Sequence, residues 1–147
     1  MIRKFDIKDI NAVMQLWINE NIRAHSFISK NYWIDHYLYV KGVLPKAEIY
    51  VYVIDDKVAG FIGLNHDHIE GIFVDSIVQG HGIGSALLNK VKENRTYLTL
   101  SVYKKNKHAI EFYKKKGFVI LSENKEDQTK EIEYLMSWYE DLEEDKN

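Results

Sequence analysis

Residues 74–88 have the sequence VDSIVQGHGIGSALL and contain three glycines at alternate positions. The apolar run 69–74 leads into them, and an apolar pattern with helical spacing follows. This order predicts a strand, a tight loop and the first turn of a helix. Such a turn leaves backbone N–H groups without partners, and glycines keep side chains away from them. The stretch therefore predicts a site for a phosphate or pyrophosphate, although glycines at such a turn also serve close packing alone.

The spacing of the glycines indicates which class of phosphorylated ligand the loop could bind. A dinucleotide fingerprint, G-x-G-x-x-G, needs glycine at position 85, where the chain has Ser85, and the P-loop pattern G-x-x-x-x-G-K-[ST] is absent. What remains is Gln79-x-x-Gly82-x-Gly84. This spacing argues against a module that binds ATP or NAD through the loop, but that alternative stays open.

A second segment, residues 106–118, has the sequence NKHAIEFYKKKGF. Together the two segments resemble the GNAT superfamily of acetyl-CoA-dependent N-acetyltransferases, and short matches elsewhere resemble its small bacterial members. The first is similar to the family motif Q/R-x-x-G-x-G/A, and the second to N-x-x-A-x-x-F-Y-x-x-x-G-F. The resemblance is specific through residues 58–120 and implies an α/β fold with a mixed sheet of about seven strands and helices on both faces.

Hydrophobic periodicity places the elements of that fold along the chain. It predicts strands at 2–5, 49–54, 58–64, 69–74, 97–102, 118–121 and 130–138. It predicts a first helix that begins near residues 6–9, a broken second helix over 21–43, and two further helices over 80–92 and 107–116. The resemblance implies that strands 69–74 and 97–102 are parallel and splay apart, and that the pantetheine arm of the cofactor enters the gap.

Composition restricts the remaining classes. The 147 residues predict one N-acetyltransferase domain over residues 1–139 and an acidic, disordered tail over 140–147. A net charge of −2 gives no reason to expect nucleic acid, and no run approaches the ~20 apolar residues of a membrane span. With no cysteine and no signal-peptide pattern, we expect a cytoplasmic protein without a membrane partner.

The resemblance implies acetyl-CoA as co-substrate. Backbone N–H groups of the glycine loop would hold the pyrophosphate, the strand before it would pair with the pantetheine amides, and the Val74 N–H would face the thioester oxygen. Asn106 matches the family residue that binds the pantetheine arm, and it also suits the N-cap of the following helix. The predicted cofactor residues are Ile72, Phe73, Val74, Gln79, Gly80, His81, Gly82, Ile83, Gly84, Ser85, Asn106 and Tyr113.

Transfer to a primary amine by direct attack needs a proton acceptor for the amine and an acid for the departing thiolate. The motif makes Tyr113 the candidate general acid, with packing of an aromatic helix face as the alternative. Glu70 is the first candidate base and His68, through a water, the second, although Glu70 also suits an outward-facing strand position. His66 and His68 have no third ligand in the sequence, so we expect no metal site.

The acceptor amine is the least determined feature. In the family fold the acceptor pocket lies between the first two helices, the start of strand 69–74 and the last hairpin, which indicates His25, Phe27 and Trp33. These aromatics also suit the core. Protein lysine, a peptide N-terminus, a polyamine and an antibiotic amine all stay open, as do a monomer and a homodimer. A non-catalytic acyl-CoA-binding sensor of the same fold is the alternative function.

Overall fold

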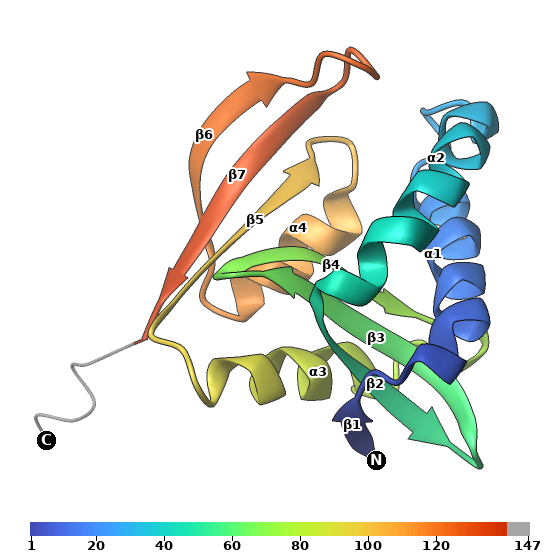
Figure 1. The fold of residues 1–147 in the computed structure, drawn as a ribbon. Coiled ribbons are helices and arrows are strands. Elements are labelled where there is room, and N and C mark those ends of the chain that lie inside the picture. Colours follow the sequence, from blue (N-terminus) through green and yellow to red (C-terminus); the bar gives the residue numbers. More distant parts are fainter. Residues whose placement is uncertain (141–147) are drawn as a thin grey trace, which may run out of the picture.

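The computed structural model describes residues 1–140 as a single mixed sheet with helices on both faces (Figure 1). Its seven strands run in the order β1-β2-β3-β4-β5-β7-β6. Their bounds are β1 Ile2–Lys4, β2 Glu48–Ile54, β3 Lys57–Asn65, β4 His68–Val74, β5 Tyr97–Tyr103, β6 Val119–Lys125 and β7 Ile132–Tyr139. The α/β fold class is confirmed. Of the predicted tail 140–147, all but Glu140 lies outside the described residues.

The helices form two layers, one on each side of the sheet. Helices α1 (Ile10–Ala24) and α2 (Lys30–Val43) lie on one face, whereas α3 (Ile83–Lys92) and α4 (Lys107–Lys115) lie on the other (Figure 1). Each face has its own core. Val13, Met14 and Phe61 belong to the α1 core, and Leu87 and Leu98 to the α3–α4 core.

Three elements differ from the prediction by three residues or more. The helix expected from Gly80 begins at Ile83, because Gly80 and Gly82 have φ angles of 85° and 80° that no right-handed helix allows. The broken helix expected over 21–43 is instead the end of α1 followed by α2, which Ser29 caps. The sixth strand extends to Lys125, well beyond the expected 121, since its polar half pairs with β7 through the backbone.

The central feature of the sheet is the divergence of β4 from β5. These strands are the one parallel pair within residues 1–140, where they pair only at His68↔Thr99 and Ile69↔Leu100. On its other side, β4 pairs with β3 as far as Val74, with one extra residue, Glu70, that forms a β-bulge. Beyond Ile69 a gap therefore opens between the two halves of the sheet (Figure 1).

Candidate active site

The β4 edge beside the gap has backbone groups that pair with no other strand of residues 1–140. The Asp75 N–H donates to the Ala59 carbonyl of β3 at 2.8 Å. Since successive residues of a strand direct their backbone groups to opposite sides, Ile72 and Val74 present theirs to the gap. This edge can pair with the amides of an extended ligand such as a pantetheine arm.

The side chains of β4 point alternately to the two faces of the sheet. Ile72 and Val74 pack against the α3–α4 core, whereas Phe73 points to the α1 face and stacks on Phe61 at 4.9 Å between ring centroids. The Phe73 ring lies across Gly71, where a Cβ atom would come within 2.4 Å of it. Glycine at position 71 therefore makes room for the ring beside the bulge.

The glycine loop follows β4 and a short 3-10 turn, Ser76–Val78. Apart from each glycine and its two chain neighbours, no heavy atom of residues 1–140 lies within 4 Å of a Cβ built on Gly80 or Gly82, so the space beside these glycines is open. His81 is exposed, whereas the Ile83 side chain is 3% exposed and belongs to the core. The first N–H groups of α3 lack intrahelical partners. Open space, left-handed glycines and a helix N-terminus fit the pyrophosphate of CoA.

Gln79 ties the start of this loop to α1. Its Nε2 donates to the Val74 carbonyl at 2.9 Å and to Glu20 Oε1 at 3.1 Å. Burial raises the pKa of Glu20, an effect that Arg23 partly offsets. Our sequence prediction missed Glu20. The available signal was its spacing from Val13 and Met14, which places a carboxylate near the buried face of α1.

Asn106 begins α4 and contacts the acceptor side. Its Oδ1 accepts from the Ala109 N–H at 3.3 Å, which confirms the N-cap interpretation. Its Nδ2 lies 3.3 Å from His25 Nε2. This bond makes His25 Nε2 the acceptor and assigns the ring proton to Nδ1. Both predicted cofactor segments are thus held by side chains at the C-terminal end of α1.

Tyr113 faces the core beneath the gap. It is 8% exposed and packs edge-on against Phe112 and Phe118 at 5.3 and 5.5 Å between ring centroids. Ile72 and Val74 pack against the same core cluster. Burial raises the pKa of Tyr113 above its ordinary value. The phenol therefore keeps its proton at neutral pH, as a general acid must.

The two candidate bases occupy different positions on β4. His68 is half-buried at the apex of the gap, with Nδ1 2.8 Å from Thr99 Oγ1 on β5. Glu70 is exposed at the bulge and borders a groove of about 540 Å³ beneath α2, which Trp17 and Phe73 also line. Neither residue forms a salt bridge within the described chain.

His25, Phe27 and Trp33 come together as the sequence predicted, and Tyr103 of β5 joins them. His25 stacks on Trp33 at 5.3 Å and packs edge-on against Phe27 at 5.7 Å and Tyr103 at 5.1 Å between ring centroids. Burial lowers the pKa of His25 and raises that of Tyr103. The prediction missed Tyr103, although it immediately follows the predicted strand 97–102.

Carboxylates from the last hairpin approach the same region. The Tyr32 hydroxyl on α2 lies 3.4 Å from Glu126 Oε1 and 3.2 Å from Gln128 Oε1. Burial raises the pKa of Glu133 on β7, Glu126 raises it further, and His68 opposes the shift. Glu133, which our sequence prediction also missed, is thus close enough to His68 to interact with it electrostatically.

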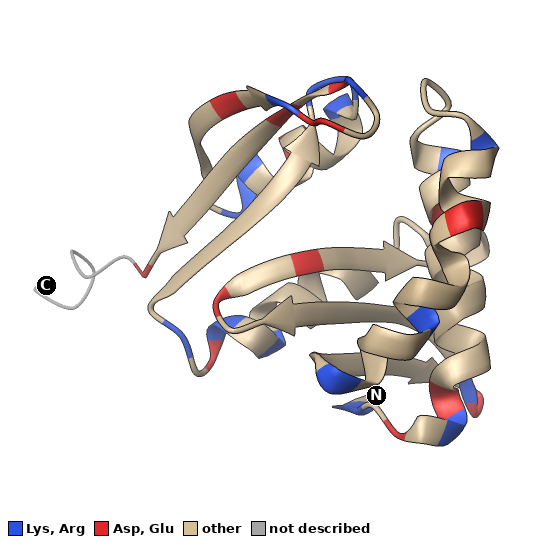
Figure 2. Ribbon diagram, turned by 45° about the horizontal axis from the view of Figure 1, so that its top comes forward, with Lys and Arg blue, Asp and Glu red and all other residues tan. Residues whose placement is uncertain are grey.

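Basic and acidic residues are mixed along the ribbon of residues 1–140, including the β6–β7 hairpin (Figure 2). Within that part of the chain, no helix has the length and apolar character needed to cross a membrane.

The mixed seven-stranded sheet splays between two parallel strands, and a glycine loop precedes the next helix. This is the architecture of an acetyl-CoA-dependent acetyltransferase. Residues 45–120 match the family model described as an acetyltransferase (GNAT) domain. The chain belongs to this family and is an N-acetyltransferase that uses acetyl-CoA.

Three known proteins illustrate the relationship. The chain is 34% identical to the peptidyl-lysine N-acetyltransferase YiaC of Escherichia coli strain K12 over 140 residues, which cover 94% of this chain and 96% of YiaC. The solution structure of apo YjaB from Escherichia coli superimposes with a TM-score of 0.84 at 26% identity, covering 96% and 98% of the two chains. A candidate streptothricin acetyltransferase from Bacillus anthracis strain Ames, in complex with acetyl coenzyme A, has a TM-score of 0.59 at 26% identity and covers 65% and 63%.

Proposed function

We propose that this enzyme acetylates the ε-amine of lysine side chains in proteins. The observation that carries the chemistry is the gap between β4 and β5, which ends at an open glycine loop. The acceptor class is supported by the 34% identity with YiaC, which is named a peptidyl-lysine N-acetyltransferase. It is supported also by Glu70, Glu126 and Glu133 around the predicted acceptor side, because carboxylates attract an ammonium group.

The cofactor-binding residues of the proposal occupy the gap and the loop. The backbone groups of Ile72 and Val74 would pair with the pantetheine arm, and the Val74 N–H would donate to the thioester oxygen. The N–H groups of residues 79–85 would hold the pyrophosphate, and the second hydrogen of Asn106 Nδ2 would bind the arm. When bound, acetyl-CoA would supply the activated acetyl group that the acceptor amine attacks.

Two groups of the chain would move protons. Tyr113 would donate its phenolic proton to the sulfur that leaves, since burial keeps that proton in place. Glu70, or His68 through a water, would accept the proton of the attacking amine. Thr99 Oγ1 lies 2.8 Å from His68 Nδ1, and in the tautomer whose Nδ1–H donates to this hydroxyl oxygen, Nε2 would accept the proton.

The pH dependence of the E70Q and H68Q variants separates the two bases. If Glu70 is the base, kcat/KM of E70Q falls by about 10²–10⁴ and the acidic limb of its pH profile disappears. If His68 is the base, H68Q shows that loss instead, and E70Q keeps the acidic limb. Two variants with unchanged profiles would exclude both residues.

Calorimetry and mass spectrometry test the function itself. The purified protein should bind acetyl-CoA but neither ATP nor NAD, and should transfer acetyl groups to lysine-containing peptides. Modification at the α-amine of those peptides, or of polyamines alone, would contradict the lysine assignment. Binding without any transfer to an amine would instead favour a sensor of the same fold.

A further inference from the structure

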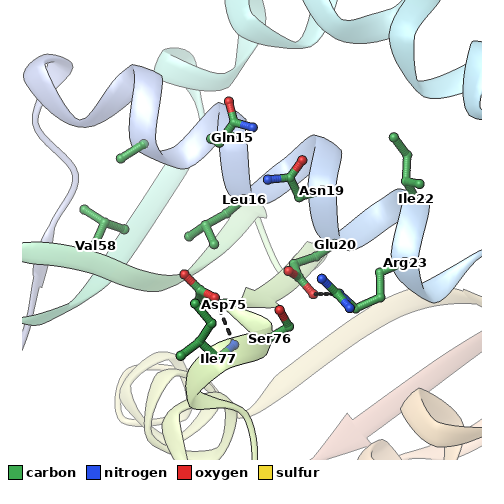
Figure 3. A pocket seen from close by; sticks show the side chains of 11 residues that line it. Gln15, Leu16, Asn19, Glu20, Ile22, Arg23, Val58, Asp75, Ser76 and Ile77 are labelled. Carbon is green, nitrogen blue, oxygen red and sulfur yellow. Dashed lines mark hydrogen bonds and ion pairs between the residues drawn. The ribbon is translucent and has the colours of Figure 1, made fainter.

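Glu20 is a nearly buried carboxylate beside the cofactor loop. It lies on α1 and is 8% exposed. Figure 3 shows it projecting from the helix toward the segment that carries Asp75 and Ser76, with Arg23 beside it. A buried carboxylate is costly unless it has partners, so its contacts indicate its role.

Two side chains contact Glu20 Oε1. Gln79 Nε2 donates to it at 3.1 Å, and Arg23 Nε lies 3.5 Å away. The Arg23 side chain is 61% exposed, so solvent screens this ion pair. The bond to Gln79 is partly buried, and it joins α1 to a residue 59 positions later in the chain.

Glu20 is one of two acceptors that hold the Gln79 side chain. The two hydrogens of an amide nitrogen can serve two acceptors, and Gln79 Nε2 has Glu20 and the Val74 carbonyl. The next residues, Gly80 and Gly82, have left-handed backbones and no side chain that could hold the loop. A glycine loop that no side chain holds in place samples more conformations, and ordering the loop when the cofactor binds lowers the affinity.

The negative charge of Glu20 argues against direct contact with the cofactor. A carboxylate repels the phosphates that the loop is proposed to bind. Helix α1, in turn, is fixed to the sheet by the buried Val13, Met14 and Leu16. Glu20 would therefore act on the cofactor through a neighbour, and of its neighbours Arg23, Ser76 and Gln79 it is Gln79 that leads directly into the glycine loop.

We propose that Glu20 is a positioning residue of the acetyl-CoA site, which holds Gln79 so that the glycine loop is preorganised for the pyrophosphate. The proposal rests on the cofactor site proposed above. It assigns to α1 a part in cofactor binding, and it predicts that the oxygen acceptor at position 20 matters more than its charge.

Calorimetric titration with acetyl-CoA tests the proposal on the full chain. E20A and Q79A should each raise Kd about tenfold, and the double variant should raise it no more than about twofold further, because both changes remove the same bond between Glu20 and Gln79. E20Q keeps an oxygen that accepts from Gln79, so its Kd should stay within roughly threefold of wild type. R23A is the matched control, and its Kd should stay within about twofold.

Thermal unfolding of each variant separates positioning from folding. If E20A does not fold, E20Q and Q79A carry the test, and the E20Q/Q79A double variant should bind no more than about twofold more weakly than Q79A. Unchanged binding by E20A or Q79A, additive losses in the double variant, or a tenfold loss in E20Q would overturn the role of Glu20. Failure of the wild type to bind acetyl-CoA would instead overturn the proposed cofactor site, and the role of Glu20 with it.

Discussion

Replacing Tyr113 by phenylalanine removes one hydroxyl group and leaves the ring in place between Phe112 and Phe118. Within residues 1–140 the Tyr113 hydroxyl makes no hydrogen bond, so the change breaks none in the folded chain. The free energy of unfolding should therefore change by less than about 1 kcal/mol. The loss of a general acid should lower kcat by about 10²–10⁴, which is roughly 3–5 kcal/mol of barrier height.

The assay follows release of the CoA thiol at saturating acetyl-CoA and acceptor, with Kd for acetyl-CoA measured separately. Y113F should keep Kd within about twofold, because the hydroxyl acts on the departing sulfur. Tyr52→Phe is the control, since Tyr52 packs against the same core from β2, far from the gap in the sheet order. A Y113F enzyme with kcat within threefold of wild type would show that Tyr113 only packs.

Three further predictions concern the loop, a helix end and an ion pair. Gly82→Val should raise Kd for acetyl-CoA at least about tenfold, because φ of 80° costs a β-branched residue about 1–2 kcal/mol and the new side chain shields the N–H groups; unchanged calorimetric affinity would exclude this loop as the phosphate site. Gly117→Ala should lower Tm by roughly 2–8 °C, because its φ is 94° and its Cβ would lie 3.1 Å from Trp138 Cδ1; an unchanged melting curve would contradict that strain. The hydrogen bonds from Arg3 lower the pKa of Asp9, so Asp9 stabilises the fold above its ordinary pKa of about 3.9, and this stabilisation is lost as pH falls through the lowered value. The difference in free energy of unfolding between wild type and D9N, measured with urea, should therefore shrink from pH 6 to pH 3. A difference that stays constant over this range would contradict the role of Asp9.

The sequence predicted those parts of the fold that depend on local pattern. Alternation and glycine spacing identified the strand, loop and helix around residues 69–92, and Gly117 ends α4 in the left-handed conformation that its position indicates. The start of α3 was wrong by three residues, because helical periodicity does not reveal the φ angles of Gly80 and Gly82.

The site was predictable only where motif residues carry it. The aromatic cluster of His25, Phe27 and Trp33 was found through resemblance, and the N-cap of Asn106 through its position before a helix. Glu20 and Glu133 could not be found in that way, since their roles depend on contacts between distant segments. For Glu20, a carboxylate on the apolar face of a predicted helix is a signal that the sequence alone contains.

The backbone amide NMR spectrum of the protein, recorded with and without acetyl-CoA, tests the cofactor site most directly. The account predicts that the largest shift changes fall on Val74, on Gly80 to Ser85 and on Asn106, with small changes in β1 and β2. Saturable binding whose largest changes lie in β1 and β2, with the glycine loop unaffected, would contradict the assignment of the gap between β4 and β5 as the acetyl-CoA site.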